Sequence, residues 1–290
     1  MSYRSVFRPD LFRDRTVVIT GGGSGIGRCT AHELASLGAS LALLGRKVDK
    51  LETVRDEIVA AFPKAQVSCH ACDIREEDRV RETLSAVLQR HGRVDGLFNN
   101  AGGQYPSPLK DISLKGWETV VKNNLTGGFL MARECYTQWM AGNGGAIVNI
   151  IADMWNGMPG MGHSGAARAG MLNFTETAAC EWASAGVRVN AVAPGWIASS
   201  GFDTYPPEFQ ALTKKLKRKV PLQRFGTESE ISAAVVFLLS EAAAFITGAC
   251  LRIDGGVPNA RHTWPLTQHQ RSRSYNGFPL YRPPAWMGEE

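Results

Sequence analysis

Residues 16–27 read TVVITGGGSGIG, an apolar run of strand length that leads directly into a run of glycines. Cys29–Leu37 follows with apolar side chains at helical spacing, so the glycines lie between a strand and a helix. Glycines in that place let the backbone turn sharply and approach a pyrophosphate, which then rests on the N-terminus of the helix. The stretch therefore predicts a dinucleotide-binding turn, with contacts from Gly21, Ser24, Gly25, Ile26 and Gly27.

The rest of the chain alternates apolar runs of strand length with amphipathic stretches. This alternation is typical of βαβ units and predicts an α/β fold, a Rossmann-like doubly wound parallel sheet that is buried on both faces. We expect strands over residues 16–20, 40–44, 65–72, 96–99, 146–151, 187–192 and 250–253, and helices over 29–37, 48–62, 77–91, 116–140 and 228–239. A single domain should span residues 1–256, and residues 257–290, which lack periodicity, should form an extended C-terminal tail.

Composition excludes several classes of protein. Of the 290 residues, 44% are hydrophobic and 20% are charged, which is ordinary for a globular domain. The sequence has neither an apolar stretch of membrane-spanning length nor a signal peptide, so we expect a cytoplasmic protein without a membrane partner. The net charge of +5 is scattered and predicts no nucleic-acid partner. Cys69 and Cys72 form a single CxxC pair, which we interpret as structural, and we expect no metal site.

Two cations, Arg46 and Lys47, follow the second expected strand, and no acid does. A carboxylate in this place binds the ribose 2′-hydroxyl of NAD, whereas a guanidinium suits the 2′-phosphate of NADP. The pair therefore favours NADP(H) as the cofactor. A solvated basic turn is the alternative.

After the glycine run the sequence contains, in this order, Asn99-Asn100-Ala101-Gly102, Asn124-Leu125-Thr126-Gly127, Pro194-Gly195 and Asp254-Gly255-Gly256. With these motifs the chain resembles the short-chain dehydrogenase/reductase family from about Asp14 to Gly256. Asn124, in the expected helix 116–140, matches the asparagine that supports a proton relay in the family. The segment 197–224 falls where the family places its substrate lid. The resemblance also implies cofactor contacts from Asp73, Ile74, Asn100, Ala101, Gly102, Arg168, Pro194, Gly195 and Ile197.

The catalytic triad departs from the family pattern. Alignment of residues 164–170 with the family's catalytic helix puts Ser164 at the tyrosine, Arg168 at the lysine and Ile151 near the serine. A serine hydroxyl titrates far above neutral pH, so it cannot replace a phenol as the base that oxidises an alcohol. Hydride addition to a double bond conjugated to a thioester is less demanding, because hydrogen-bond donors can hold the oxyanion that forms. Ser164 could be such a donor, and Arg168 could hold the ribose and supply positive charge.

Residues 163–170, with 99–104 and 148–151, are similar to the peroxisomal trans-2-enoyl-CoA reductase branch. The 2,4-dienoyl-CoA reductases also resemble the chain in lacking tyrosine at this point. The likeness implies an NADPH-dependent reductase of an unsaturated acyl-CoA thioester. Two alternatives stay open: a dehydrogenase of an alcohol, aldehyde or 3-ketoacyl substrate, for instance of a branched or terpenoid chain, with His163 as proton donor, and a cofactor-binding homologue without catalysis.

Some features allow two interpretations. His163 could donate a proton or pack on its loop, and Asp153 could orient a water or be structural. Tyr205 is expected to pack in the lid. A cluster of cations is either a solvated helix face or a patch for the phosphates of a CoA substrate. Its members are Lys214, Lys215, Lys217, Arg218 and Lys219.

A homotetramer is expected from the resemblance. In the family, the helices that hold Asn124 and residues 164–178 commonly pair across a two-fold axis. The chain has small residues on the second of these helices, which suit close packing between subunits. They are Ala166, Ala167, Ala169 and Gly170.

Overall fold

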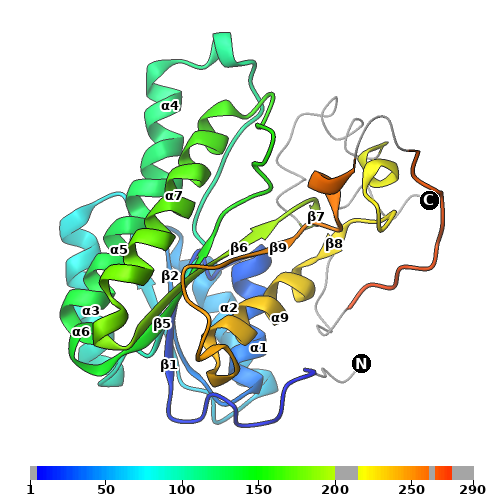
Figure 1. Cartoon of the computed structure of the whole chain (residues 1–290). Helices are drawn as coiled ribbons and strands as arrows, with labels where there is room; N and C mark the ends of the chain where they lie inside the picture. Colours follow the sequence, from blue (N-terminus) through cyan, green and yellow to red (C-terminus); the bar gives the residue numbers. More distant parts are fainter. Residues whose placement is uncertain (1–4, 200–214, 261–264, 276–290) are drawn as a thin grey trace.

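Seven parallel strands form the central sheet of the computed structural model, in the order β3-β2-β1-β4-β5-β6-β9 (Figure 1). The structure describes residues 5–199, 215–260 and 265–275. The strand order reverses between β1 and β4, which is the doubly wound arrangement expected from the sequence. The strands are β1 (Thr16–Thr20), β2 (Ser40–Gly45), β3 (Val67–Ala71), β4 (Gly96–Asn99), β5 (Gly145–Ile150), β6 (Val187–Pro194) and β9 (Cys250–Ile253).

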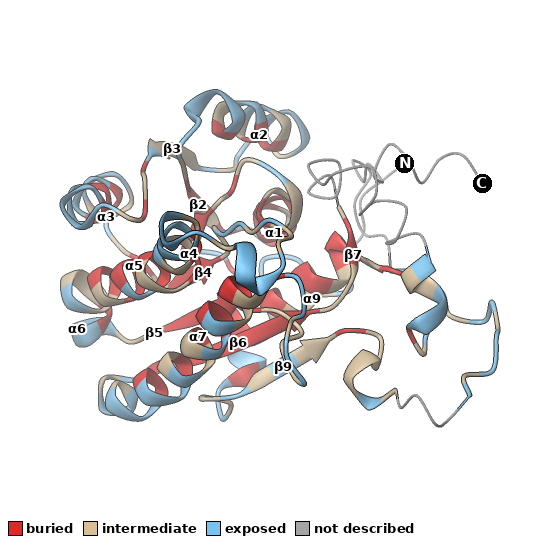
Figure 2. Cartoon of the chain, turned by 90° about the horizontal axis from the view of Figure 1, so that it is seen from above, coloured by how far each residue is buried: buried red, intermediate tan, exposed pale blue. Residues whose placement is uncertain are grey.

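Helices cover both faces of the sheet (Figures 1 and 2). On one face α1 (Gly25–Ser36), α2 (Val48–Ala61) and α9 (Glu228–Leu239) share an apolar core with the strands. On the other face α3 (Glu77–His91), α5 (Gly127–Cys135) and α7 (Gly162–Glu181) form the second core. Every residue of β1 is buried, because a central strand of a covered parallel sheet has no solvent face.

The prediction of one continuous helix over residues 116–140 is wrong, because the helical segment is divided into several elements. The structure has α4 (Leu114–Val121), a π-helical turn (Lys122–Thr126), α5, a second π-helical turn (Tyr136–Met140) and α6 (Ala141–Asn143). Each π turn adds a residue to the local hydrogen-bonded ring, and such turns are frequent at functional sites. The first of them contains Asn124.

The first helix begins at Gly25 and not at Cys29, so part of the glycine run forms its first turn. Ser24 precedes the helix in an extended conformation and is its N-cap residue. Three-residue 3₁₀ helices complete the described elements. They span Leu109–Asp111, Ala183–Ala185, Lys217–Lys219, Glu241–Ala243 and Val257–Asn259.

A second, two-stranded parallel sheet was not expected from the sequence. It joins β7 (Ile197–Ala198) to β8 (Gly226–Thr227), and strands of two residues carry no periodicity to predict them from. The segment 197–224 that was expected to form a lid begins with β7 and ends two residues before β8. Tyr205 and Lys214, on which two expectations depend, lie outside the described residues.

Two expected absences and the interpretation of the CxxC pair can be compared with the described residues. No helix in these ranges is long and apolar enough to cross a membrane. The same ranges hold no group of three or more His, Cys, Asp or Glu side chains that could bind a metal ion. Cys69 and Cys72 are both free thiols, and burial raises the pKa of each.

Candidate active site

A cleft of about 510 Å³ opens at the carboxyl ends of the central strands, where the strand order reverses. Most of the residues that the sequence predicts at a cofactor line this cleft. They are Gly21, Ser24, Ile26, Arg46, Asp73, Ile74, Asn100, Ala101, Gly102, Arg168, Pro194, Gly195 and Ile197. Gly25, Gly27 and Lys47 are not among its lining residues.

The glycine turn is tight because its neighbours leave no room for a side chain. A Cβ at Gly27 would collide with the carbonyl oxygen of Gly21 and lie 2.6 Å from Asn100 Nδ2. Gly21 itself has a φ of +65°, in the left-handed region. Gly25 and Gly27 therefore shape the turn while Gly21, Ser24 and Ile26 face the cleft.

Thr20, at the end of β1, ties this turn to the loop after β4. Its Oγ1 accepts hydrogen bonds from the backbone nitrogens of Asn100 and Ala101, each at 2.9 Å. Asn100 Nδ2 donates in turn to the Thr20 carbonyl oxygen at 2.9 Å. One threonine thus fixes the glycine turn and the loop after β4, which form two walls of the cleft, relative to each other. The sequence reasoning missed Thr20, whose only signal was its place between the strand and the first glycine.

Arg46 and Asp73 bring opposite charges to the part of the cleft beside the ends of β2 and β3. Arg46 and Lys47 follow β2 and are both exposed; Arg46 lines the cleft, whereas Lys47 does not and precedes α2. Asp73 lies after β3 and accepts hydrogen bonds from Arg75 Nε at 2.8 Å and Arg75 N at 3.1 Å. These bonds, together with the Arg46 charge, lower the pKa of Asp73. A glycine turn without room for Cβ and a cation at its ribose side fit a dinucleotide.

Asn124 binds both backbone polar groups of a single residue in the loop after β4. Its Nδ2 donates to the Gly103 carbonyl oxygen at 3.0 Å, and its Oδ1 accepts from the Gly103 nitrogen at 2.9 Å. The side chain is buried in the π turn, so this clamp is fixed. Asn124 therefore positions the neighbouring Gln104, which lines the cleft. Its expected part in a proton relay stays a prediction.

Ser164, where the family has tyrosine, is fully buried and does not line the cleft. Its Oγ donates to Gln104 Oε1 at 2.5 Å, so the hydroxyl acts on the cleft through Gln104. His163 is also fully buried: its Nδ1 accepts from Ser164 N at 2.9 Å, and its Nε2 has no hydrogen-bond partner among the described residues. Gln104 is a site residue that sequence reasoning did not select, although it stood in the quoted run 99–104.

Arg168 lines the cleft as a buried cation. Its Nη1 donates to the Ile150 carbonyl oxygen at 2.7 Å, and a Cβ at Gly102 would lie 2.5 Å from its Nη2. Burial lowers the pKa of Arg168 to about 10, so the guanidinium remains charged at neutral pH. No carboxylate among the described residues forms an ion pair with it, and its Nε is without a hydrogen-bond partner. A buried, unpaired cation favours negative charge that forms beside it.

Ile151 presents an apolar side chain to the cleft at the place of the family's serine. Asp153, two residues further on, has a buried Oδ1 without a hydrogen-bond partner among the described residues. Burial and the nearby Asp254 raise the pKa of Asp153, and Arg252 opposes them. Asp153 lines neither the cleft nor the cavity beside it, so its expected action on a water stays a prediction.

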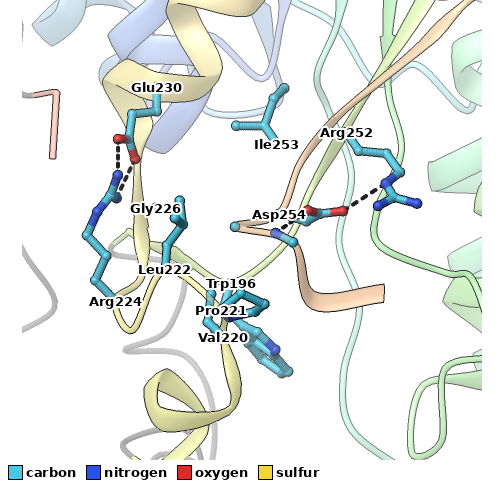
Figure 3. Close-up of a pocket in the computed structure, with 12 residues that line it drawn as sticks. Trp196, Val220, Pro221, Leu222, Arg224, Gly226, Glu230, Arg252, Ile253 and Asp254 are labelled. Carbon is cyan, nitrogen blue, oxygen red and sulfur yellow. Dashed lines mark hydrogen bonds and ion pairs between the residues drawn. The ribbon is translucent and has the colours of Figure 1, made fainter. Parts of the chain in front are cut away.

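A second cavity, of about 540 Å³, lies beside the carboxyl end of β9 (Figure 3). Its apolar lining includes Trp196, which directly follows Gly195 of the cleft. Two ion pairs, Arg224–Glu230 and Arg252–Asp254, complete the walls. The described members of the cationic cluster line neither hollow. They are Lys215, Lys217, Arg218 and Lys219.

Comparison with known proteins identifies the family. A family model described as Enoyl-(Acyl carrier protein) reductase matches residues 21–258. A probable 2,4-dienoyl-CoA reductase of Bacillus subtilis is 36% identical over 245 residues, 83% of this chain and 96% of that protein. The structure of a citronellol catabolism dehydrogenase of Pseudomonas aeruginosa PAO1 is 57% identical, with a TM-score of 0.79 over 88% of this chain and 100% of the other. An NAD⁺-bound xylitol dehydrogenase is 30% identical, with a TM-score of 0.76 over 84% and 99%.

A doubly wound sheet with a glycine turn at its switch point defines a dinucleotide-dependent enzyme. The chain belongs to the short-chain dehydrogenase/reductase family, and it is an oxidoreductase of that family. The resemblance inferred from the sequence motifs, including the likeness to 2,4-dienoyl-CoA reductases, is confirmed. The family uses a nicotinamide cofactor, NAD or NADP. The named substrates of the relatives are too diverse to give this chain a substrate by kinship alone.

Proposed function

We propose that the protein reduces the carbon–carbon double bond of an enoyl-CoA or dienoyl-CoA thioester with NADPH. The observation that carries the proposal is the pairing of two changes in one site. Arg168, which is buried and forms no ion pair with a described carboxylate, lines the cleft, and the phenol of the family is replaced by a buried Ser164. The site thus has a cation that can stabilise an oxyanion as it forms. It lacks the tyrosine that the family uses as the base in alcohol oxidation.

Each residue then has a defined part in the reaction. When bound, NADPH would supply a hydride, to Cβ of an enoyl thioester or to Cδ of a 2,4-dienoyl thioester. Negative charge would then develop on the thioester oxygen, and a proton from water would complete the reduction at Cα. Arg168 stabilises that charge with little reorganisation, because its bond to the Ile150 carbonyl already fixes the guanidinium. Asn124 and Ser164 are positioning residues: one clamps Gly103 and the other orients the Gln104 amide.

NADPH is proposed over NADH because Arg46 lines the ribose end of the cleft. The guanidinium forms no ion pair with a described carboxylate, and such a group can bind a phosphate with two parallel hydrogen bonds. A dianionic 2′-phosphate also gains more from this cation than a neutral hydroxyl does.

A second candidate is a dehydrogenase of a terpenoid alcohol or aldehyde. The observation that favours it is the name of the 57% identical relative, a citronellol catabolism dehydrogenase. The same name favours a branched acyl chain for the first candidate, and the apolar lining of the second cavity would accept one. It includes Trp196, Val220, Pro221, Leu222 and Ile253.

One pair of assays separates the candidates. NADPH oxidation is measured with straight and branched 2-enoyl-CoA and 2,4-dienoyl-CoA, and NADP⁺ reduction with branched primary alcohols. NADPH deuterated at the transferred position should place deuterium on Cβ of the product from a 2-enoyl thioester and on Cδ of the product from a 2,4-dienoyl thioester, as seen by NMR. Turnover of alcohols alone would overturn the reductase proposal, and turnover of thioesters alone would overturn the second candidate.

We also propose that the protein is a homotetramer. Large apolar side chains on α4 and α5 are exposed, which is typical of association surfaces: Leu114, Trp117 and Phe129 have 73%, 37% and 37% of their surface accessible. Light scattering at micromolar concentration should give four times the mass of the chain. A monomeric mass would refute this.

A further inference from the structure

A short segment beyond the region that the family model matches packs on the fold beside the second cavity. The match ends at residue 258, and residues 265–275 lie past it. Figure 1 shows this segment as the orange-red trace next to the yellow part of the chain. We name residues 265–275 the strap.

Side chains near the middle of the strap bind a wall of the second cavity. His269 Nε2 donates to the carbonyl oxygen of Pro221 at 3.0 Å. Arg224 Nε donates to Ser272 Oγ at 2.9 Å, and Arg224 Nη2 donates to the carbonyl oxygen of Arg273 at 3.2 Å. Pro221 and Arg224 both line the cavity (Figure 3).

The end of the strap binds the first turn of α9. Thr227 Oγ1 donates to the carbonyl oxygen of Tyr275 at 2.7 Å, and Tyr275 N donates to Glu230 Oε1 at 3.3 Å. Thr227 and Glu230 also form the capping box of α9. The Tyr275 hydroxyl interacts with Ser5, and burial raises the pKa of this phenol.

These anchors connect the strap to the cofactor cleft. Glu230 and Arg224 form an ion pair with two hydrogen bonds, at 2.6 and 2.8 Å. The middle of the strap binds Arg224 and its end binds Glu230, so this ion pair connects the two points of attachment. Thr227 belongs to β8, whose partner strand β7 contains Ile197 of the cleft. The Gly226 nitrogen also donates to the Trp196 carbonyl oxygen at 2.9 Å.

We propose that the strap is a positioning element that holds the wall from Pro221 to Thr227 and thereby sets substrate affinity. Without the strap, the wall would become ordered only when substrate binds. The conformational entropy lost in that step would then weaken substrate binding. The hydrogen bonds given above join the strap to Pro221, Arg224, Thr227 and Glu230 and not to the glycine turn or Arg46, so we expect cofactor affinity to be unchanged. This proposal depends on the proposed function in one respect, which is that a thioester is the substrate in the KM measurement below.

Two truncated enzymes test the proposal. A chain that ends at Ala260 lacks the strap, and a chain that ends at Tyr275 keeps it and is the matched control. In the shorter chain we expect faster hydrogen–deuterium exchange at the amides of Gly226, Thr227 and Glu230, with the NADPH Kd within about twofold. KM for the thioester should rise by about fivefold to fiftyfold, with a smaller change in kcat, since the lost hydrogen bonds act on binding alone.

Side-chain variants keep the test valid if the shorter chain folds poorly. H269A with S272A removes two anchors and should raise KM and exchange in the same direction. S274A changes an exposed strap residue and should do neither. Equal exchange and equal KM in the strapped and strapless enzymes would overturn the proposal. Exchange needs no substrate, so a strap effect without thioester turnover would reject the proposed substrate and not the strap.

Discussion

Replacing Glu228 with glutamine should make the protein more stable at pH 8 than the native chain. Glu228 is the first residue of α9 and only 8% exposed. Its Oε1 lies 3.7 Å from the place where a Cβ on Gly25 would be, so the carboxylate packs against the glycine turn. No described residue forms a hydrogen bond with it. Burial raises the pKa of Glu228 to about 7, and the nearby Arg28 opposes this only in part.

The magnitude follows from the two pKa values. The carboxyl titrates at about 7 in the folded chain and at 4.5 in the reference state. Between these values the folded state holds the proton and the unfolded state has lost it, so stability falls as pH rises from 4.5 to 7. The full difference is about 3 kcal/mol above pH 7. Glutamine resembles the protonated acid in shape and does not titrate, so the variant avoids this loss.

Urea unfolding of both proteins at pH 5, 6.5 and 8 measures the effect. The stability advantage of E228Q should be only about 0.8 kcal/mol at pH 5 and grow to about 3 kcal/mol at pH 8. E241Q is the matched control, because the Glu241 side chain is 84% exposed and should show no such growth. Parallel pH curves for E228Q and the native chain would refute the reasoning.

The remaining predictions concern the cleft. R46A should weaken NADPH binding by about tenfold to a hundredfold in a fluorescence titration and leave NADH binding nearly unchanged, since only the 2′-phosphate contact is lost. G27A should weaken both cofactors by about tenfold or more, because its Cβ would collide with the Gly21 carbonyl and Asn100. R168M should lower kcat for thioester reduction by about a hundredfold or more in steady-state assays, and a smaller loss would remove the oxyanion role. K215A with K219A should raise KM for the CoA thioester but not for a truncated thioester without the nucleotide; equal effects would place the cationic cluster outside the CoA site.

The sheet could be predicted because its signal is local. β1 and β4 appear with the bounds that the apolar runs give, and the glycine turn follows β1 as expected. The π turn at Asn124 and the short sheet of β7 and β8 could not be predicted. A π turn differs from an α-helix by one residue in its hydrogen-bond ring and leaves no mark in apolar spacing.

The site was predictable where chemistry is carried by single residues. Gly21, Arg46 and Arg168 line one cleft as their types and places suggested. The bond between Ser164 and Gln104 was not predictable, because it joins residues 60 positions apart in the sequence. That no described carboxylate forms an ion pair with Arg168 likewise depends on which strands and helices pack together, and the sequence alone does not show this packing.

The N-terminus of α9 links the parts of the molecule that bind different ligands. Glu228 packs against the cofactor turn, and Thr227 and Glu230 bind the strap. Within one helical turn, the same backbone therefore supports the cofactor site, the wall of the second cavity and the C-terminal segment. A substitution that moves this turn should change cofactor and substrate binding together, whereas loss of the strap should change substrate binding alone. That difference separates damage to the helix start from loss of the element that it anchors.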